Sequence, residues 1–389
     1  MNKNDKSCLQ ACAAAMLLAG SSAAGAGVNL KLESDVGYDS NVFNLSDGVG
    51  VRGGAFVRLD FNAGAALPTM GRWVTELDAG ATTLKYGTSV EDGNETQVFA
   101  RVGGDSGGKR GDHRFTWAMR YRDRDSTYVS HFTGDVATYG GTSIGDRYDS
   151  GILDATAEWR LPDTSFGRFS LSGGAVSKNY KEDYDGLLNS SLVPTDRLDY
   201  GEFELRPALE LGDKVNTFRV RVPVALRKYR DRRISDVNGA AIAGTDLEYR
   251  YVGLDLRFQR DLTHTSRLAF SGDVERRMDN GGGYGDLQRW SVGSDWSWHP
   301  AAEQRLSAGL KWSSRVLNNT NASDPAVVDE SPDKKGYSIS VDGQTPFPGV
   351  SISGLSLVAE LNWESFRNSN DDRYTYDRWE TFLGVRKEF

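Results

Sequence analysis

The alternation of apolar and polar side chains is clearest in the stretch Phe218-Arg219-Val220-Arg221-Val222-Pro223-Val224-Ala225-Leu226-Arg227. Every even-numbered residue in it is apolar, and three of the odd-numbered residues are arginines. Because successive side chains of a β-strand point to opposite faces, this stretch predicts a strand with one apolar and one charged face. It is longer than the five or six residues typical of soluble strands, and it is long enough to cross a membrane.

The same alternation recurs along the whole chain and predicts an all-β fold, a transmembrane antiparallel up-and-down β-barrel of about 16 strands. An even strand number returns the C-terminus to the side where the first strand begins. We expect strands at residues 28–38, 54–66, 72–86, 94–103, 113–125, 150–161, 168–181, 198–211, 216–230, 247–260, 265–278, 287–298, 304–317, 336–344, 354–366 and 376–389.

The connections between these strands alternate between short and long, as expected of periplasmic turns and external loops. The long ones are 39–53, 126–148, 182–197, 231–246 and 318–335, whereas 87–93 and 279–286 are shorter than this rule predicts. Residues 126–148 form the longest, which would be the third external loop. It could fold into the pore, as the third loop does in general diffusion porins, or lie over the mouth. Pro207 and Pro223 lie in adjacent strands and lack a ladder donor, which predicts a local weak point there.

The aromatic residues sort to the two predicted ends of the barrel. All sixteen tyrosines fall in the external loops or in the outer halves of strands. Trp73, Trp159, Trp296, Phe169 and Phe218 fall at the periplasmic ends. Amphipathic rings prefer the two interfaces of a membrane, so this sorting favours a membrane barrel over a soluble β-sandwich.

The N-terminal segment has the parts of an export signal. Lys3 and Lys6 precede a short apolar core at 11–19, and Ala24-Gly25-Ala26 offers a cleavage site. The alternative is a buried helix with a disordered tail. We therefore expect a signal peptide at 1–26 and one barrel domain at 27–389, because no linker or charge block divides the rest. Both cysteines, Cys8 and Cys12, lie in the signal segment, so the mature chain would have no thiol chemistry.

If the apolar face of each strand meets lipid, the charged face lines the interior. The pore-lining residues predicted in this way are Arg120, Arg122, Arg219, Arg221, Arg257, Asp154, Glu158, Glu204 and Glu360. Neither sign dominates. The charges could pair across strands and stiffen the wall, or they could form a field that screens solutes by charge, and the two roles are compatible.

The sequence gives no sign of an enzyme, a metal site or a cofactor. The four histidines are His113, His131, His264 and His299, and none stands at a recognised metal-ligand spacing from Cys, Asp or Glu. The acidic pairs Asp123 with Asp125 and Asp371 with Asp372 are typical of solvated loops or of cation sites that bridge lipopolysaccharide. The net charge of −8 and the lack of a basic patch argue against a nucleic-acid partner.

Two short segments resemble known outer-membrane proteins. The final strand, from Arg378 to Phe389, alternates and ends on an aromatic residue. It resembles the closing strand of bacterial outer-membrane proteins, and this implies that Phe389 is the signal read by the barrel-assembly machinery. Lys387 departs from the usual apolar residue at its position. The segment Val36-Gly37-Tyr38-Asp39-Ser40-Asn41-Val42-Phe43 resembles the opening of a family of β-barrel porins often found with exopolysaccharide biosynthesis and secretion genes.

These patterns place the chain in the Gram-negative outer membrane, with its lipids and lipopolysaccharide as surroundings. The family resemblance implies a passive conduit in exopolysaccharide export, with the polysaccharide and periplasmic export proteins as partners. The alternatives are a porin for small solutes and a non-conducting barrel whose loops bind the cell surface.

Overall fold

A computed structural model describes the chain from Val28 to Phe389. Within this span the described residues exclude 47–48, 88–89, 108–111, 130–134, 140–141, 147, 182–197, 236–240, 284, 302, 318–333, 351 and 369–374. The predicted signal peptide, the cysteines and His131 lie outside the described residues. No helix in the described part of the chain is long and apolar enough to cross a membrane.

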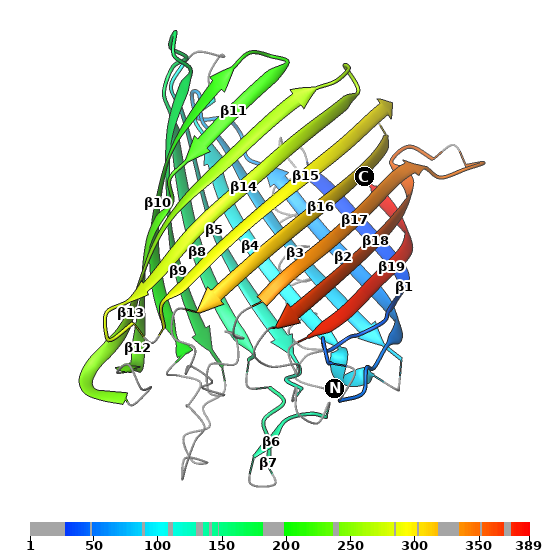
Figure 1. The fold of residues 1–389 in the computed structure, drawn as a ribbon. Helices are drawn as coiled ribbons and strands as arrows, with labels where there is room; N and C mark the ends of the chain where they lie inside the picture. The colour runs from blue at the N-terminus through cyan, green and yellow to red at the C-terminus, as the bar shows by residue number, and fades with distance from the viewer. Residues whose placement is uncertain are drawn as a thin grey trace.

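The described chain forms a closed antiparallel barrel with sixteen strand positions, as the sequence predicts (Figure 1). Each strand pairs with its neighbour in the chain, and the last pairs with the first. The strands are β1 (Val28–Asp39), β2 (Gly54–Ala66), β3 (Val74–Tyr86), β4 (Glu95–Asp105), β5 (Arg114–Ser126), β8 (Ser150–Arg160), β9 (Arg168–Tyr180), β10 (Tyr200–Gly212), β11 (Asn216–Arg221), β12 (Val224–Ser235), β13 (Ala241–Asp261), β14 (Ser266–Asp279), β15 (Leu287–Ala301), β16 (Gln304–Leu317), β17 (Lys334–Pro346), β18 (Leu355–Asn368) and β19 (Tyr376–Glu388).

The ninth position of the barrel is shared by β11 and β12, which are separated at the predicted weak point. Pro223 has no N–H to donate, so the ladder with β10 is interrupted there. The wall stays continuous because Val222 donates to the carbonyl of Pro207 (N···O 3.0 Å) and Gly253 donates to the carbonyl of Pro223 (N···O 2.9 Å). The interruption is therefore local, and both halves pair with β10 and with β13.

The short turns gather at one end of the barrel and the long connections at the other (Figure 1). One expected long loop, 231–246, is much shorter, because β12 and β13 continue past the neighbouring strands as an extended hairpin. An ion pair between Arg233 and Asp246 joins the two strands of this extension. Ile234, Leu247 and Tyr249 are buried against one another beside it, and this apolar contact stabilises the hairpin.

Residues 126–148 do not lie as one irregular loop. They contain a two-stranded hairpin, β6 (Thr138–Tyr139) with β7 (Thr142–Ser143), which projects away from the barrel wall at the long-loop end (Figure 1). Val129, Ala137 and Ile144 are buried within it. In the described part of this loop, the inward fold of a general diffusion porin is not seen.

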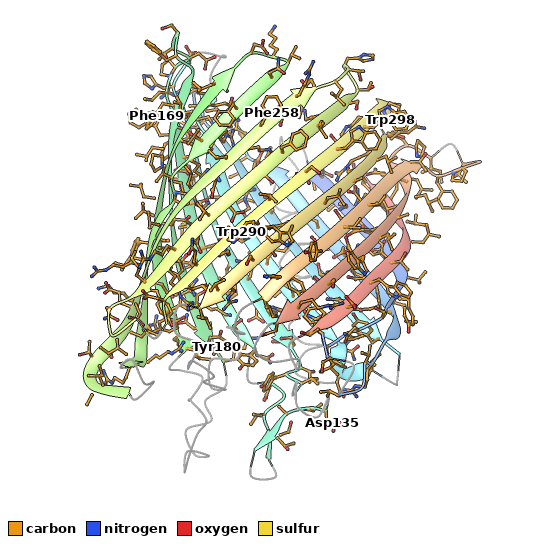
Figure 2. The ribbon with its side chains drawn as sticks, viewed as in Figure 1. Asp135, Phe169, Tyr180, Phe258, Trp290 and Trp298 are labelled. Atoms are coloured by element: carbon orange, nitrogen blue, oxygen red, sulfur yellow. The ribbon has the colours of Figure 1, made fainter. Side chains whose placement is uncertain are left out.

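The outward face of the barrel is apolar, with aromatic residues near both ends. Figure 2 shows Phe169, Phe258 and Trp298 at the short-turn end, and Tyr180 lies at the end with the long loops. The exposed side chains between the ends are mainly aliphatic, among them Val57, Leu59, Leu254, Leu256, Leu310 and Leu383. An apolar band with aromatic rows at its rims is the surface expected of a barrel in a bilayer.

The barrel closes where β1 and β19 meet, and two glycines allow the close packing at this seam. A Cβ on Gly384 would come within 1.7 Å of the Asp35 carboxylate, and a Cβ on Gly37 would come within 2.5 Å of the Phe56 ring. Side chains larger than hydrogen would push the inward-facing groups of neighbouring strands away. The glycines therefore permit the buried charge cluster described next.

Candidate functional site: the charged inner wall

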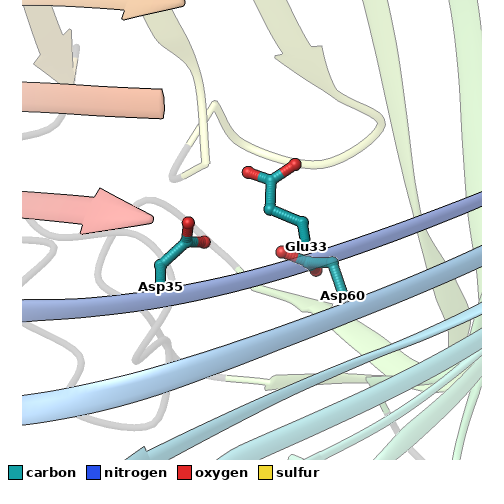
Figure 3. Close-up of side chains that lie close together, drawn as sticks. All are labelled: Glu33, Asp35 and Asp60. Carbon is teal, nitrogen blue, oxygen red and sulfur yellow. The ribbon is translucent and has the colours of Figure 1, made fainter. Parts of the chain in front are cut away.

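The inner face of the wall carries a connected set of charges at the seam. On β1 the carboxylates of Glu33 and Asp35 are almost fully buried, with side-chain exposures of 5% and 0%. Arg58 of β2 lies 2.8 Å from Asp35, 3.4 Å from Glu33 and 3.1 Å from Asp60. Figure 3 shows the three carboxylate side chains close together on β1 and β2. Arg386 of β19 also bonds to Glu33, with Nε 2.7 Å from the carboxylate.

The carboxylates of Glu33, Asp35 and Asp60 lie close enough together to hold a cation. The guanidinium of Arg58 already contacts all three, so it supplies the positive charge that such a group requires. The cluster is therefore an ion-pair network that ties β1 to β2 and β19. Closure of the barrel places the backbones of β19, β1 and β2 side by side, and this brings the charged side chains of the network together.

A second cluster that joins β1 to β19, called the buried clasp below, is centred on Asp39, the last residue of β1, which is fully buried. Its carboxylate accepts from Arg378 Nε of β19 at 3.0 Å and from the Tyr86 hydroxyl at 3.2 Å. Asn41 follows it and is also fully buried. The Asn41 amide nitrogen donates to the carbonyls of Leu45 and Asp377, at 2.8 and 3.2 Å, so it fixes the first loop to the start of β19.

Parts of the first two long-end connections fold into the barrel mouth. Leu45 is fully buried and Val90 is 2% exposed. Val90 packs with Phe56, Tyr86 and Phe382, which share the inner face with Arg58. These connections, and not 126–148, carry the described chain that packs against the inner wall. The sequence signal for this inward packing is the apolar residues Val42, Phe43 and Val90, which are unusual in a loop surrounded by water.

The nine residues predicted to line the pore lie on this same inner face, and most form ion pairs. Arg120 and Arg122 both reach Asp154 of the next strand, at 3.2 and 3.4 Å. Arg219 lies 2.7 Å from Glu210, and Arg221 lies 3.9 Å from Asp255.

The remaining predicted residues show a second kind of pairing, within one strand. Glu158 lies 3.0 Å from Arg160, and Glu204 pairs with Arg206. Glu360 accepts a bond from the Asn362 amide at 2.6 Å. The sequence interpretation considered only pairs across strands. Residues i and i+2 share a face and are about 6.6 Å apart along a strand, which a long arginine side chain spans.

Arg257 differs from the other eight. It stands directly opposite Arg219 in the register of β13 with β11. Among the described residues it forms no ion pair, and its side chain is exposed on the inner face. A guanidinium without an ion-pair partner among the described residues makes this part of the wall locally positive.

A recess of about 290 Å³ opens on the inner face across β16 to β19 and the adjoining β1. It brings hydrogen-bonding groups of both signs together, and its polar lining includes Glu33, Arg305, Asp342, Gln344, Glu360 and Arg386. Of these, only Glu360 is among the residues predicted from the sequence. Arg305, Asp342, Gln344 and Arg386 come from strands close to β18 in the chain, and only Glu33 comes from a strand distant in sequence.

The architecture is a closed antiparallel barrel of the kind found in bacterial outer membranes, and solved structures with this fold align with nearly the whole chain. A BenF-like porin from Pseudomonas fluorescens Pf-5 matches with a TM-score of 0.50 at 10% identity, covering 94% of this chain and 99% of that one. OccK11 of Pseudomonas aeruginosa matches with a TM-score of 0.46 at 12% identity, covering 94% and 96%. At these identities the likeness concerns the fold alone. No protein-family model matches the sequence, and no curated protein matches it.

Proposed function

We propose that this chain is a passive channel for hydrophilic solutes in the Gram-negative outer membrane. The observation that carries the proposal is the contrast between the two faces of one closed wall. The outward face is apolar between aromatic rims, and the inward face carries charged pairs on strands around the barrel. A sixteen-stranded barrel is wide enough to hold water in its interior, and such charges are natural only where water reaches them.

In this proposal Arg120, Arg122, Arg219, Arg221, Arg257, Asp154, Glu158, Glu204 and Glu360 line the pore. Because most of them pair with an opposite charge, the pore has little net field and should discriminate weakly between small cations and anions. The recess lined by Gln344 and Glu360 offers hydrogen bonds of both kinds, which suits neutral, hydroxyl-rich solutes. The proposal gives the chain no catalytic role.

Export of an exopolysaccharide is the more specific form of the proposal, and the segment from Val36 to Phe43 is what favours it. A porin for small solutes fits the same wall equally well. In both cases passage is driven by the solute gradient or by periplasmic partners. Assembly machinery that reads Phe389, surrounding lipids and periplasmic export proteins are the partners implied.

Purified protein in planar bilayers tests the channel itself. Discrete conductance steps with weak ion selectivity are expected, and a refolded barrel that never conducts would support the non-conducting alternative.

A deletion strain then distinguishes between the two possible cargoes, an exopolysaccharide and small solutes. Lost surface polysaccharide with normal sugar uptake supports export, and impaired sugar uptake with normal polysaccharide supports the small-solute porin.

A further inference from the structure

Cationic side chains gather on the outward face of the barrel at the long-loop ends of β12, β13 and β14. Lys228 and Arg230 come from β12, Arg250 from β13 and Arg276 from β14. All four are exposed, and the side chains of Lys228 and Arg250 are 64% and 67% exposed. Each shares one face of its strand with an exposed apolar residue, Val224, Val252 or Val274, so the four cations point away from the charged interior.

The strand register places these cations directly above the apolar band. Arg250 lies opposite Leu226, and Arg276 lies opposite Val252. The next outward residue of β14 toward the barrel middle is Val274, which is paired with Trp290. Along β13 the outward side chains are apolar from Val252 to Phe258. Arg250 thus stands where the apolar surface ends, which is the headgroup level of a bilayer.

The patch is left positive. Among its described residues, the carboxylate of Glu248 lies 2.9 Å from Lys228 and 3.4 Å from Arg250. Arg230 and Arg276 have no ion-pair partner among the described residues. Among the described residues of the patch, four cationic groups therefore stand with one carboxylate, which cannot neutralise them all.

The same depth on another strand has the opposite charge. The outward residues of β5 at its long-loop end are Asp123 and Asp125. Lys181 bonds to both, at 2.6 and 2.5 Å, so these acids are already satisfied within the protein. At this depth the acids of β5 are therefore neutralised within the protein, whereas the β12–β14 sector keeps unpaired cations among its described residues.

We propose that this sector binds the phosphate groups of lipopolysaccharide in the outer leaflet. Lysine and arginine bind phosphate through charge-assisted hydrogen bonds, and arginine can do so with two parallel bonds. The apolar surface of Val252, Val274 and Trp290 lies where the acyl chains of the same lipid would pack. The proposal rests on the outer-membrane location given under Proposed function, but it does not require that the barrel conducts.

The test uses the full mature chain, refolded in detergent, with Lys228, Arg250 and Arg276 all replaced by glutamine. The temperature at which the folded gel band is lost is measured while phosphorylated lipid A, dephosphorylated lipid A or a zwitterionic phospholipid is added. Phosphorylated lipid A should stabilise the unmodified protein at concentrations at least about tenfold lower than it stabilises the triple variant. Dephosphorylated lipid A should act weakly and equally on both.

Lys85→Gln is the matched control, because Lys85 is an exposed cation at the long-loop end of β3. It should bind like the unmodified protein. Should the triple variant refold poorly, Arg276→Gln alone serves, since it breaks no ion pair among the described residues. Equal titrations for variant and unmodified protein, or equal effects of phosphorylated and dephosphorylated lipid, would overturn the proposal. Bilayer conductance of the same variant should be unchanged, so a failed channel and a failed lipid site are told apart.

Discussion

Replacing Asp39 with alanine should destabilise the barrel strongly, because it removes the carboxylate that joins the first strand to the last. Asp39 is fully buried and accepts bonds from Arg378 at 3.0 Å, from the Tyr86 hydroxyl at 3.2 Å and from the backbone N–H of Asn41 at 2.9 Å. Breaking a buried ion pair from one side costs about 3–5 kcal/mol. Arg378 keeps Glu380 at 3.4 Å and Glu364 at 3.8 Å, so we expect a loss near the lower value, about 3 kcal/mol.

Asp377→Ala is the control for this change, because it removes an equally well-bonded but exposed carboxylate two residues before Trp379. Its partner Arg367 lies 2.7 Å away, and the two side chains are 50% and 55% exposed. Solvent weakens such a pair, so its removal should cost less than about 1 kcal/mol. Urea unfolding of the refolded variants, followed by tryptophan fluorescence, measures both. Equal stability losses for the two variants would refute the assignment of Asp39 as a buried clasp.

Three further predictions concern pH, register and assembly. Burial first, and then the neighbouring charges of Asp125 and Asp146, raise the pKa of Asp149 from 3.8 to about 6. The stability this group contributes is therefore present below pH 3.8 and lost by about pH 6. Asp149→Asn, which keeps an acceptor for the Ser126 amide, should lose less stability than the unmodified protein between pH 4 and pH 7, by at most about 2 kcal/mol in urea titrations. Single cysteines in place of Arg120 and Arg219 should react with a water-soluble maleimide, and those in place of Trp117 and Val220 should not; the reverse pattern would mean that the faces are exchanged. Deletion of Phe389 should lower the yield in the outer membrane while leaving refolding in detergent intact, because its ring is 69% exposed and packs little; normal yield in cells would contradict a role in assembly.

The strands could be predicted from the sequence because alternation is a local pattern. All sixteen strand positions are found, and most ends agree within two or three residues. The extra length of β13 was missed because residues 241–246 do not alternate and are held by contacts with β12, such as Arg233 with Asp246. The gap between β11 and β12 could be predicted as a weak point because a proline at position 223 has no N–H to donate to the strand ladder.

The seam was harder to predict because its partners are remote. Asp39 and Arg378 are separated by 339 positions, and nothing local pairs them. A closed barrel does bring the first and last strands together, so the acids of β1 and the arginines of β19 could have been matched once closure was assumed. The inward packing of Val90 and Leu45 could not be derived in this way, since it depends on the shape of the mouth.

The segment from Val36 to Phe43, which carries the family resemblance, has a clear physical role in this structure. Its outward side chains, Val36 and Tyr38, belong to the exposed apolar surface, and Tyr38 lies against Trp379 with ring centroids 5.1 Å apart. Its inward residues, Asp39 and Asn41, close the seam and anchor the first loop. A closed barrel of this design would need such a segment whatever solute it carried. The choice between a polymer and a small solute must therefore be made in the charged wall, where Arg257 lacks an ion-pair partner among the described residues and Glu360 borders the recess.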